Sequence, residues 1–194
     1  MNEKAAFLDR DGVINIDKGY VFKWCDFEFV PGVIDAMKVI CQLGFEIIVV
    51  TNQSGIARGY YSEDDFHKLS KSMIDFLDSE GVRVAGVYYC PHHVNGVVDK
   101  FSIACGCRKP LPEMLLKAKD DHNIDLSASI LVGDKSTDIL AGNNAGVGRA
   151  FMVAPDDGAK NLDGIHVDAY FSDLHSCANF LREEKSGAVP PLSR

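Results

Sequence analysis

The chain has 194 residues, of which 46% are hydrophobic and 25% are charged, and these values are typical of one globular domain. With 20 basic and 28 acidic side chains, its formal net charge is −8. This charge argues against nucleic acid or an anionic membrane surface as the main partner, because both bind basic faces. We see neither a signal peptide nor an apolar run long enough to span a membrane, so we expect a cytoplasmic protein with reduced cysteines.

Short apolar runs alternate with amphipathic segments, which predicts an α/β fold: a doubly wound parallel sheet with helices on both faces. The predicted strands are Ala5–Leu8, Phe45–Val50, Val84–Tyr89, Ser129–Val132, Gly148–Val153 and Asp168–Phe171. The predicted helices are Pro31–Leu43, Ser62–Glu80, Leu111–Asn123, Thr137–Asn144 and Leu174–Glu183. Ser62 and Asp65 have the spacing of a helix cap. We expect one domain over residues 1–184 and a flexible tail over residues 185–194.

Three of these strands run into polar clusters. The clusters are Asp9–Gly12, Thr51–Ser54 and Gly133–Lys135. In an open parallel sheet the ligand site lies outside the carboxyl ends of the strands, so the three clusters should meet at one place. A lone pair of aspartates at a strand end is more often a solvated turn. The joint occurrence of three such clusters favours a catalytic site instead.

The residue types in these clusters suit phosphoryl chemistry. Asp9 and Asp11 are two residues apart and point to the same side, so one can act as a nucleophile and the other as a general acid/base. Asp134 and Asp138 add negative charge that would repel a phosphate, unless Mg²⁺ neutralises the carboxylates and bridges to the phosphoryl group.

Other polar residues can bind the phosphoryl oxygens. Thr51, Asn52 and the backbone amides after them can donate hydrogen bonds to these oxygens, more strongly if a helix begins there. A lysine must offset the charge of the transition state, and Lys109 and Lys135 are both candidates.

A second cluster has the composition of a metal site. Cys90 and His92 are followed after 12 residues by Cys105 and Cys107. Three thiolates and an imidazole make a closed tetrahedral set for Zn²⁺, which indicates a structural site rather than a catalytic one. The alternative is three buried cysteines with an unrelated surface histidine. His93 is a possible substitute for His92.

The motifs FLDRDGVI, VVTNQSGIARG, CRKP and LVGDKSTDILAGNNAG resemble the four signatures of the haloacid dehalogenase-like phosphatases. The segments DKGYV, FVPGV, CPHH and CGCRKPLP are similar to a narrower branch, the D-glycero-D-manno-heptose 1,7-bisphosphate 7-phosphatases and their histidinol-phosphatase relatives. The resemblance covers about residues 3–155. Members of this branch carry zinc at the cysteine–histidine motif.

The resemblance implies a role for individual residues. Asp9 is expected to be the nucleophile and Asp11 the acid/base, with Mg²⁺ held by Asp9, the backbone carbonyl of Asp11, and Asp134. Thr51 and Lys109 would stabilise the phosphoryl group. The residues expected to contact substrate are Asp17, Lys18, Gly19, Tyr20, Thr51, Asn52, Gln53, Ser54, Arg108, Lys109 and Lys135.

The resemblance also implies a substrate. The expected reaction removes the C7 phosphate of D-glycero-D-manno-heptose 1,7-bisphosphate on the route to ADP-heptose and the lipopolysaccharide core. A histidinol-phosphate phosphatase is the alternative within the branch. A phospho-accepting receiver domain is the remote alternative, but it carries its phosphorylated aspartate on the third strand. We expect a monomer that acts on a small phosphorylated sugar.

The sequence predicts no separate cap domain. About twenty residues separate Asp11 from Pro31, too few to fold into one. Residues 17–30 are instead expected to form a loop. Its aromatic residues Tyr20, Phe22 and Trp24 could wall the site or simply pack the loop, and the two interpretations stay equally open.

Overall fold

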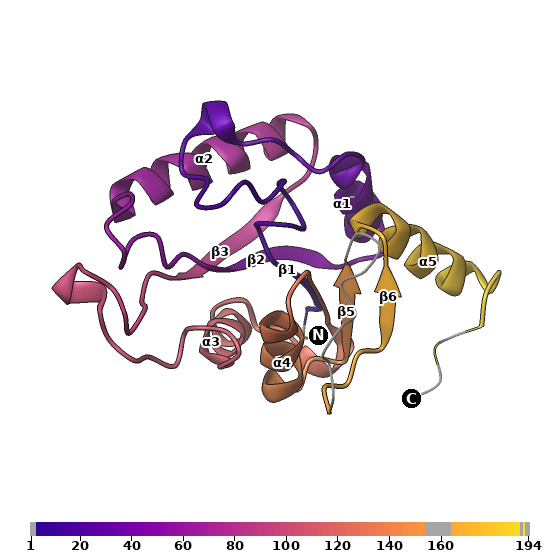
Figure 1. Cartoon of the computed structure of the whole chain (residues 1–194). Helices are drawn as coiled ribbons and strands as arrows, with labels where there is room; N and C mark the ends of the chain where they lie inside the picture. Colours follow the sequence, from indigo (N-terminus) through magenta and orange to yellow (C-terminus); the bar gives the residue numbers. More distant parts are fainter. Residues whose placement is uncertain (1–2, 154–163, 191, 193–194) are drawn as a thin grey trace.

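The computed structural model describes residues 3–153, 164–190 and 192. Its strands form one six-stranded parallel sheet in the order β3-β2-β1-β4-β5-β6 (Figure 1). They are β1 (Ala5–Leu8), β2 (Glu46–Asn52), β3 (Val84–Cys90), β4 (Ile130–Gly133), β5 (Arg149–Val153) and β6 (Ala169–Phe171). The chain proceeds from β1 outward to β3, then crosses to β4 on the other side of β1. The predicted doubly wound sheet is therefore confirmed.

Helices cover both faces of the sheet (Figure 1). One face carries α1 (Val33–Gln42), α2 (Glu63–Ser79) and α5 (Leu174–Ser186), and the other carries α3 (Glu113–His122) and α4 (Ser136–Ala145). The alternation of side chains along β1 explains this arrangement. Ala6 and Leu8 enter the core under α1 and α5, whereas Ala5 and Phe7 enter the core under α3 and α4.

The element boundaries differ from the predicted ones by a few residues. β2 continues through Thr51 and Asn52, so these two residues lie within the strand rather than beyond it. Ser62 caps α2 in a reciprocal box with Asp65, as its spacing predicts. α5 continues to Ser186 and overlaps the start of the predicted tail. Residues 191, 193 and 194 of that tail lie outside the described residues, and the domain boundary at residue 184 stays a prediction.

The segment between β1 and α1 is a loop and not a cap domain, as predicted. Residues 9–32 contain one 3₁₀ turn, Trp24–Asp26, and no longer helix. Trp24 stacks on Phe27 with ring centroids 5.5 Å apart, and both lie near Phe29, which stacks on Phe76 of α2. The aromatic residues at this end of the loop therefore pack the loop against α2.

Of the helices in the described part of the chain, none combines the length and apolar character that a membrane span needs.

Candidate active site

The residues that follow β1, β2 and β4 meet at the carboxyl edge of the sheet. Leu8 is in register with Val49 of β2 and with Val132 of β4, and β2 continues past this level to Asn52. A cavity of about 300 Å³ opens at this edge. It is lined by Asp9, Asp11, Asp17, Gly19, Tyr20, Thr51, Asn52, Gln53, Ser54, Tyr61, Lys109, Lys135, Thr137 and Asp138. The predicted convergence of the three strand ends is confirmed.

Asp9 and Lys109 form a buried ion pair in this cavity. Lys109 Nζ lies 2.8 Å from Asp9 Oδ1 and 2.7 Å from Asp138 Oδ1. Burial raises the pKa of Asp9, and Lys109 offsets this only in part. Burial would lower the pKa of Lys109, but Asp138 and Asp9 outweigh it and raise that pKa, so the lysine stays charged.

The carboxylates of Asp9, Asp134 and Asp138 are arranged to hold a cation. Each offers an oxygen within 4.8 Å of the others. Both oxygens of Asp138 have partners, Lys109 Nζ and the backbone amide of Lys135, whereas Asp134 Oδ1 is buried without one among the described residues. Burial and the neighbouring Asp9 raise the pKa of Asp134 to about 7. A buried oxygen without a partner in an acidic cluster fits a hard divalent cation such as Mg²⁺.

Gly12 allows the two strand ends to approach closely. Its φ of +93° is in the left-handed region, and a Cβ at this position would overlap the Asp134 carboxylate. Gly12 therefore lets the chain turn sharply out of β1 and also makes room for Asp134, a predicted magnesium ligand.

Thr51 also lines the cavity. Its buried hydroxyl accepts a hydrogen bond from Gln53 Nε2 at 2.8 Å, which leaves its own proton free to be donated. Asn52 Oδ1 accepts from the backbone amide of Lys109 at 3.0 Å, and Asn52 Nδ2 donates to the Lys109 carbonyl at 3.1 Å. Asn52 therefore holds the Lys109 loop against β2. The chain turns after Gln53, and the next helix begins only at Glu63.

Part of the predicted substrate segment lines the cavity. Asp17, Gly19 and Tyr20 do so, and Lys135 Nζ bridges Asp17 Oδ2 at 3.3 Å and Asp134 Oδ2 at 3.5 Å. Lys18 instead pairs with Glu28 at 2.8 Å, and it is not among the described residues that line the cavity. Of the two candidate lysines, Lys109 contacts Asp9 directly, whereas Lys135 lies half-exposed at the cavity wall.

Cys90, His92, Cys105 and Cys107 come together in a second cluster. Their ligand atoms all lie within 4.8 Å of one another, and neighbouring atoms are 3.3–3.8 Å apart. A tetrahedron with Zn–S bonds of about 2.3 Å has edges of about 3.8 Å, so the spacing suits zinc. His93 is turned away from this cluster, with Nε2 3.1 Å from Arg58 Nη2.

The cluster lies immediately before Lys109 in the sequence. Cys107 is followed by Arg108 and Lys109, and Arg108 Nη1 donates to the His92 carbonyl at 3.4 Å. Arg108 is partly buried and is not among the described residues that line the cavity. The structure therefore brings Lys109 into the site and leaves Arg108 beside it.

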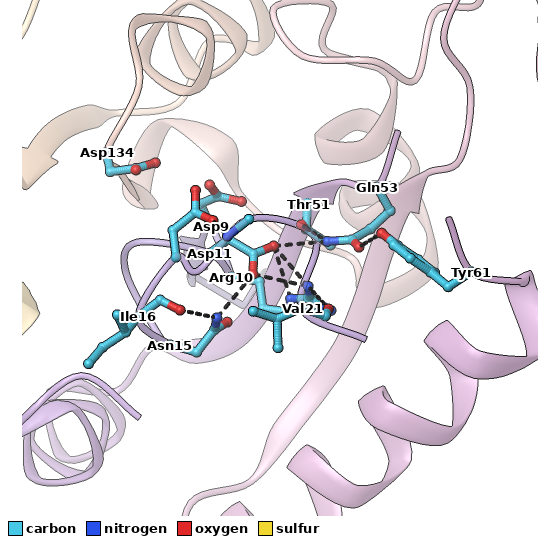
Figure 2. A network of polar contacts seen from close by, with 12 residues as sticks. Asp9, Arg10, Asp11, Asn15, Ile16, Val21, Thr51, Gln53, Tyr61 and Asp134 are labelled. Atoms are coloured by element: carbon cyan, nitrogen blue, oxygen red, sulfur yellow. Dashed lines mark hydrogen bonds and ion pairs between the residues drawn. The ribbon is translucent and has the colours of Figure 1, made fainter. Parts of the chain in front are cut away.

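Sequence reasoning missed several residues of the site. Arg10 and Tyr61 were not singled out, yet both belong to a hydrogen-bond network around Asp11 (Figure 2). The sequence predicts Asp138 only as an added negative charge, whereas the structure pairs it with Lys109, and Thr137 also lines the cavity. The available signal was that a charged residue inside a buried motif, such as Arg10 between two aspartates, needs an ionic partner.

A doubly wound sheet with these carboxylates and a buried lysine at its carboxyl edge is typical of haloacid dehalogenase-like phosphatases. A family model described as HAD-hydrolase-like matches residues 106–174. The chain is 51% identical over 149 residues to D-glycero-beta-D-manno-heptose-1,7-bisphosphate 7-phosphatase of Escherichia coli (strain K12), which covers 77% of this chain and 78% of the relative. It is 47% identical over 160 residues to D-glycero-alpha-D-manno-heptose-1,7-bisphosphate 7-phosphatase of Burkholderia mallei, which covers 82% and 85%.

A solved structure agrees with these relatives. The D,D-heptose 1,7-bisphosphate phosphatase of B. bronchiseptica, complexed with magnesium and phosphate, superposes with a TM-score of 0.80 at 31% identity. The match covers 93% of this chain and 99% of that one. The chain therefore belongs to the haloacid dehalogenase-like phosphatases, in the branch that contains the heptose bisphosphate phosphatases. It is a hydrolase of phosphate monoesters.

Proposed function

We propose that this phosphatase removes the C7 phosphate from D-glycero-D-manno-heptose 1,7-bisphosphate, in the pathway to ADP-heptose and the lipopolysaccharide core. The observation that carries the substrate assignment is the likeness, at 47–51% identity, to phosphatases named for this compound. The relatives include both the alpha and the beta anomer in their names, so each anomer is a candidate substrate.

We propose that Asp9 is the nucleophile. Its carboxylate oxygen attacks phosphorus, the bond from phosphorus to the sugar oxygen breaks, and the departing oxygen takes a proton from Asp11. Water then attacks the aspartyl-phosphate, its proton goes to Asp11, and the bond to Asp9 breaks to release inorganic phosphate. The position of Asp9 in the cavity, 2.8 Å from Lys109 Nζ, supports this role.

Thr51 and Lys109 are proposed to hold the transferred phosphoryl group. The Thr51 hydroxyl keeps a free proton to donate, and the Lys109 ammonium supplies a buried positive charge. Asp9, Asp134 and the Asp11 backbone carbonyl are proposed to hold Mg²⁺, and Mg²⁺ would neutralise charge on the phosphoryl oxygens. Asp134 Oδ1, which is buried without a partner among the residues that the structure describes, supports this ligand set.

A structural Zn²⁺ is proposed at Cys90, His92, Cys105 and Cys107. Four protein ligands leave no open position for water, so the ion would order the loop rather than take part in hydrolysis. The order of residues supports this, because Arg108 and Lys109 directly follow the last ligand. The loop would thereby place Lys109 against Asp9.

Arg108 is proposed to recognise the second phosphate of a bisphosphate, since a guanidinium can bind phosphate through two parallel hydrogen bonds. Arg108→Ala should raise KM for the bisphosphate about 10-fold and change KM for a monophosphate by less than about 2-fold. Equal damage to both substrates would place Arg108 in the reaction centre. The monomeric state and the cytoplasmic location of the chain stay predictions. Sedimentation of the purified protein tests the oligomeric state.

The experiment that tests the substrate assignment compares three compounds on one purified preparation. Phosphate release is measured with Mg²⁺ from the alpha anomer, the beta anomer and histidinol phosphate. We expect kcat/KM for one heptose anomer to exceed that for histidinol phosphate by at least about 100-fold, because differential transition-state binding sets specificity. A higher value for histidinol phosphate would overturn the assignment and leave the phosphatase chemistry intact.

A further inference from the structure

Three side chains hold the Asp11 carboxylate (Figure 2). Arg10 donates from Nε to Oδ2 at 3.1 Å and from Nη2 to both carboxylate oxygens at 2.9–3.0 Å. Asn15 Nδ2 donates to Oδ1 at 3.0 Å, and Gln53 Nε2 donates to Oδ2 at 3.0 Å. Donors on both oxygens fix the plane of the carboxylate as well as its position.

Arg10 connects this carboxylate to the segment that lines the substrate cavity. Its side chain is 1% exposed, and its Nη2 also donates to the backbone carbonyl of Val21 at 2.9 Å. Val21 follows Asp17, Gly19 and Tyr20, all of which line the cavity. Arg10 itself is not among the described residues lining it. A single buried guanidinium therefore joins the catalytic carboxylate to the substrate segment without facing the substrate.

Tyr61 makes a second connection between the same two parts. Its hydroxyl donates to Gln53 Oε1 at 2.5 Å, and Gln53 Nε2 donates in turn to Asp11 and Thr51 (Figure 2). Its ring stacks on Phe22, with centroids 5.1 Å apart and planes 10° apart. Val21 and Phe22 directly follow Tyr20, which lines the cavity, so two adjacent residues next to the cavity wall are connected to Asp11 by separate routes.

We propose that Arg10 and Tyr61 are positioning residues that keep the Asp11 carboxylate aligned with the substrate segment. This inference rests on the proposed role of Asp11 as the acid that protonates the departing sugar oxygen. Proton transfer requires close approach and correct direction, and a displacement of about 1 Å can cost about 100-fold in rate. The network fixes Asp11 and residues 17–22 relative to each other, so the bound sugar oxygen is presented to the carboxyl group.

The nature of the leaving group separates this role from a merely structural one. A sugar alkoxide must be protonated as it departs, whereas p-nitrophenolate is stable as an anion and needs little help from an acid. The test measures kcat/KM for heptose bisphosphate and for p-nitrophenyl phosphate, since kcat/KM reports the first phosphoryl transfer. The first variant is Arg10→Lys, which keeps the positive charge but loses the planar guanidinium that bonds both Asp11 oxygens. The second is Tyr61→Phe, which loses the hydroxyl but keeps the ring stacked on Phe22.

For the sugar phosphate we expect kcat/KM to fall about 30-fold in Arg10→Lys and about 5-fold in Tyr61→Phe, within the range of general acid catalysis. For p-nitrophenyl phosphate we expect losses of less than about 3-fold in both. In an Asp11→Asn background, adding Arg10→Lys should lower kcat/KM for the sugar phosphate by less than about 2-fold further, because Arg10 acts through Asp11. Tyr88→Phe is the matched control, because it also removes one hydroxyl that donates to a side-chain oxygen. The Tyr88 hydroxyl donates to Asp121 Oδ2 at 2.9 Å, and neither residue is among the described residues that line the cavity.

Equal losses of kcat/KM on both substrates in folded variants would overturn the proposal. It would also be overturned if Arg10→Lys lowered kcat/KM for the sugar phosphate as much in the Asp11→Asn background as in the parent. If Arg10→Lys melts at a much lower temperature than the parent, the test rests on Tyr61→Phe. Its loss of kcat/KM for the sugar phosphate is then compared with its loss for p-nitrophenyl phosphate. Failure of the unmodified protein to hydrolyse the sugar phosphate would refute the proposed function instead, and it is recognised before any variant is made.

Discussion

Lys109 Nζ lies 2.8 Å from Asp9 Oδ1, although the two residues are 100 positions apart in the chain. The ammonium also contacts Asp138 Oδ1 at 2.7 Å and the Val50 carbonyl at 2.8 Å. A lysine has three N–H donors, and all three are used. A phosphoryl oxygen can therefore bind Lys109 only by replacing one of these acceptors, and Asp9 is the acceptor whose oxygen would become bonded to phosphorus.

This geometry predicts a large loss of rate when the lysine charge is removed. Lys109→Met should lower kcat by at least about 100-fold, comparable to the loss of one transition-state donor, and should change KM less. Lys117→Met is the control, because Lys117 also contacts an aspartate, Asp121 at 2.9 Å, but on the exposed surface of α3. Steady-state kinetics of both variants provide the measurement. A Lys109→Met enzyme with kcat within about 3-fold of the parent would contradict the role.

The pKa of Asp134 predicts how stability depends on pH without metal. Burial and Asp9 raise that pKa from 3.8 to about 7, so in this range the folded state binds a proton more tightly than the unfolded state. The contribution of Asp134 to stability is therefore fully present below about pH 4, and it is lost as the pH rises through about 7. Calorimetry in the presence of a chelator should show a steeper fall in Tm over this window for the parent than for Asp134→Asn.

Magnesium should reverse this trend. The ion binds the ionised carboxylate and competes with the proton, so the rise in Tm on adding Mg²⁺ should be larger at pH 8 than at pH 5. In Asp134→Asn the rise should be small at both values. An equal rise at pH 5 and pH 8 in the parent would show that Mg²⁺ does not bind at Asp134.

The cysteine–histidine cluster predicts one zinc per chain. Protein purified without added zinc should contain about one equivalent, and Cys107→Ser should lose most of it together with activity, because Lys109 follows two residues later. Cys25→Ser is the control, since Cys25 is exposed and lies outside the cluster. Metal analysis by mass spectrometry and activity are measured on the same samples. A fully active parent with less than about a tenth of an equivalent of zinc would contradict the assignment.

Local chemistry explains which features could be read from the sequence. The capping box at Ser62 and Asp65 depends on a fixed spacing within one turn, so it was predictable. The convergence of the strand ends was predictable because parallel strands share a direction. The partner of Lys109 was not, since the contact with Asp138 depends on where the loop after Cys107 folds back.

The network around Asp11 shows the same limit. Arg10 is adjacent in sequence to its ionic partner, but its bond to the Val21 carbonyl depends on the path of residues 17–30. Tyr61 reaches Asp11 only through Gln53, whose side chain was expected to face substrate. The aromatic residues of the loop divide by position: Trp24 packs near Phe76, whereas Tyr20 lines the cavity. The spacing of residues in the sequence does not predict these contacts, because tertiary packing determines each of them.

The covalent role of Asp9 is tested most directly by trapping the intermediate. Enzyme turning over the sugar phosphate is quenched in acid, digested, and examined by mass spectrometry for a peptide that carries one phosphoryl group. We predict that the group lies on the peptide containing Asp9, that hydroxylamine removes it as expected for an acyl phosphate, and that it is absent from Asp9→Asn. A phosphoryl group on another residue, or an Asp9→Asn enzyme with near-normal kcat, would contradict the account.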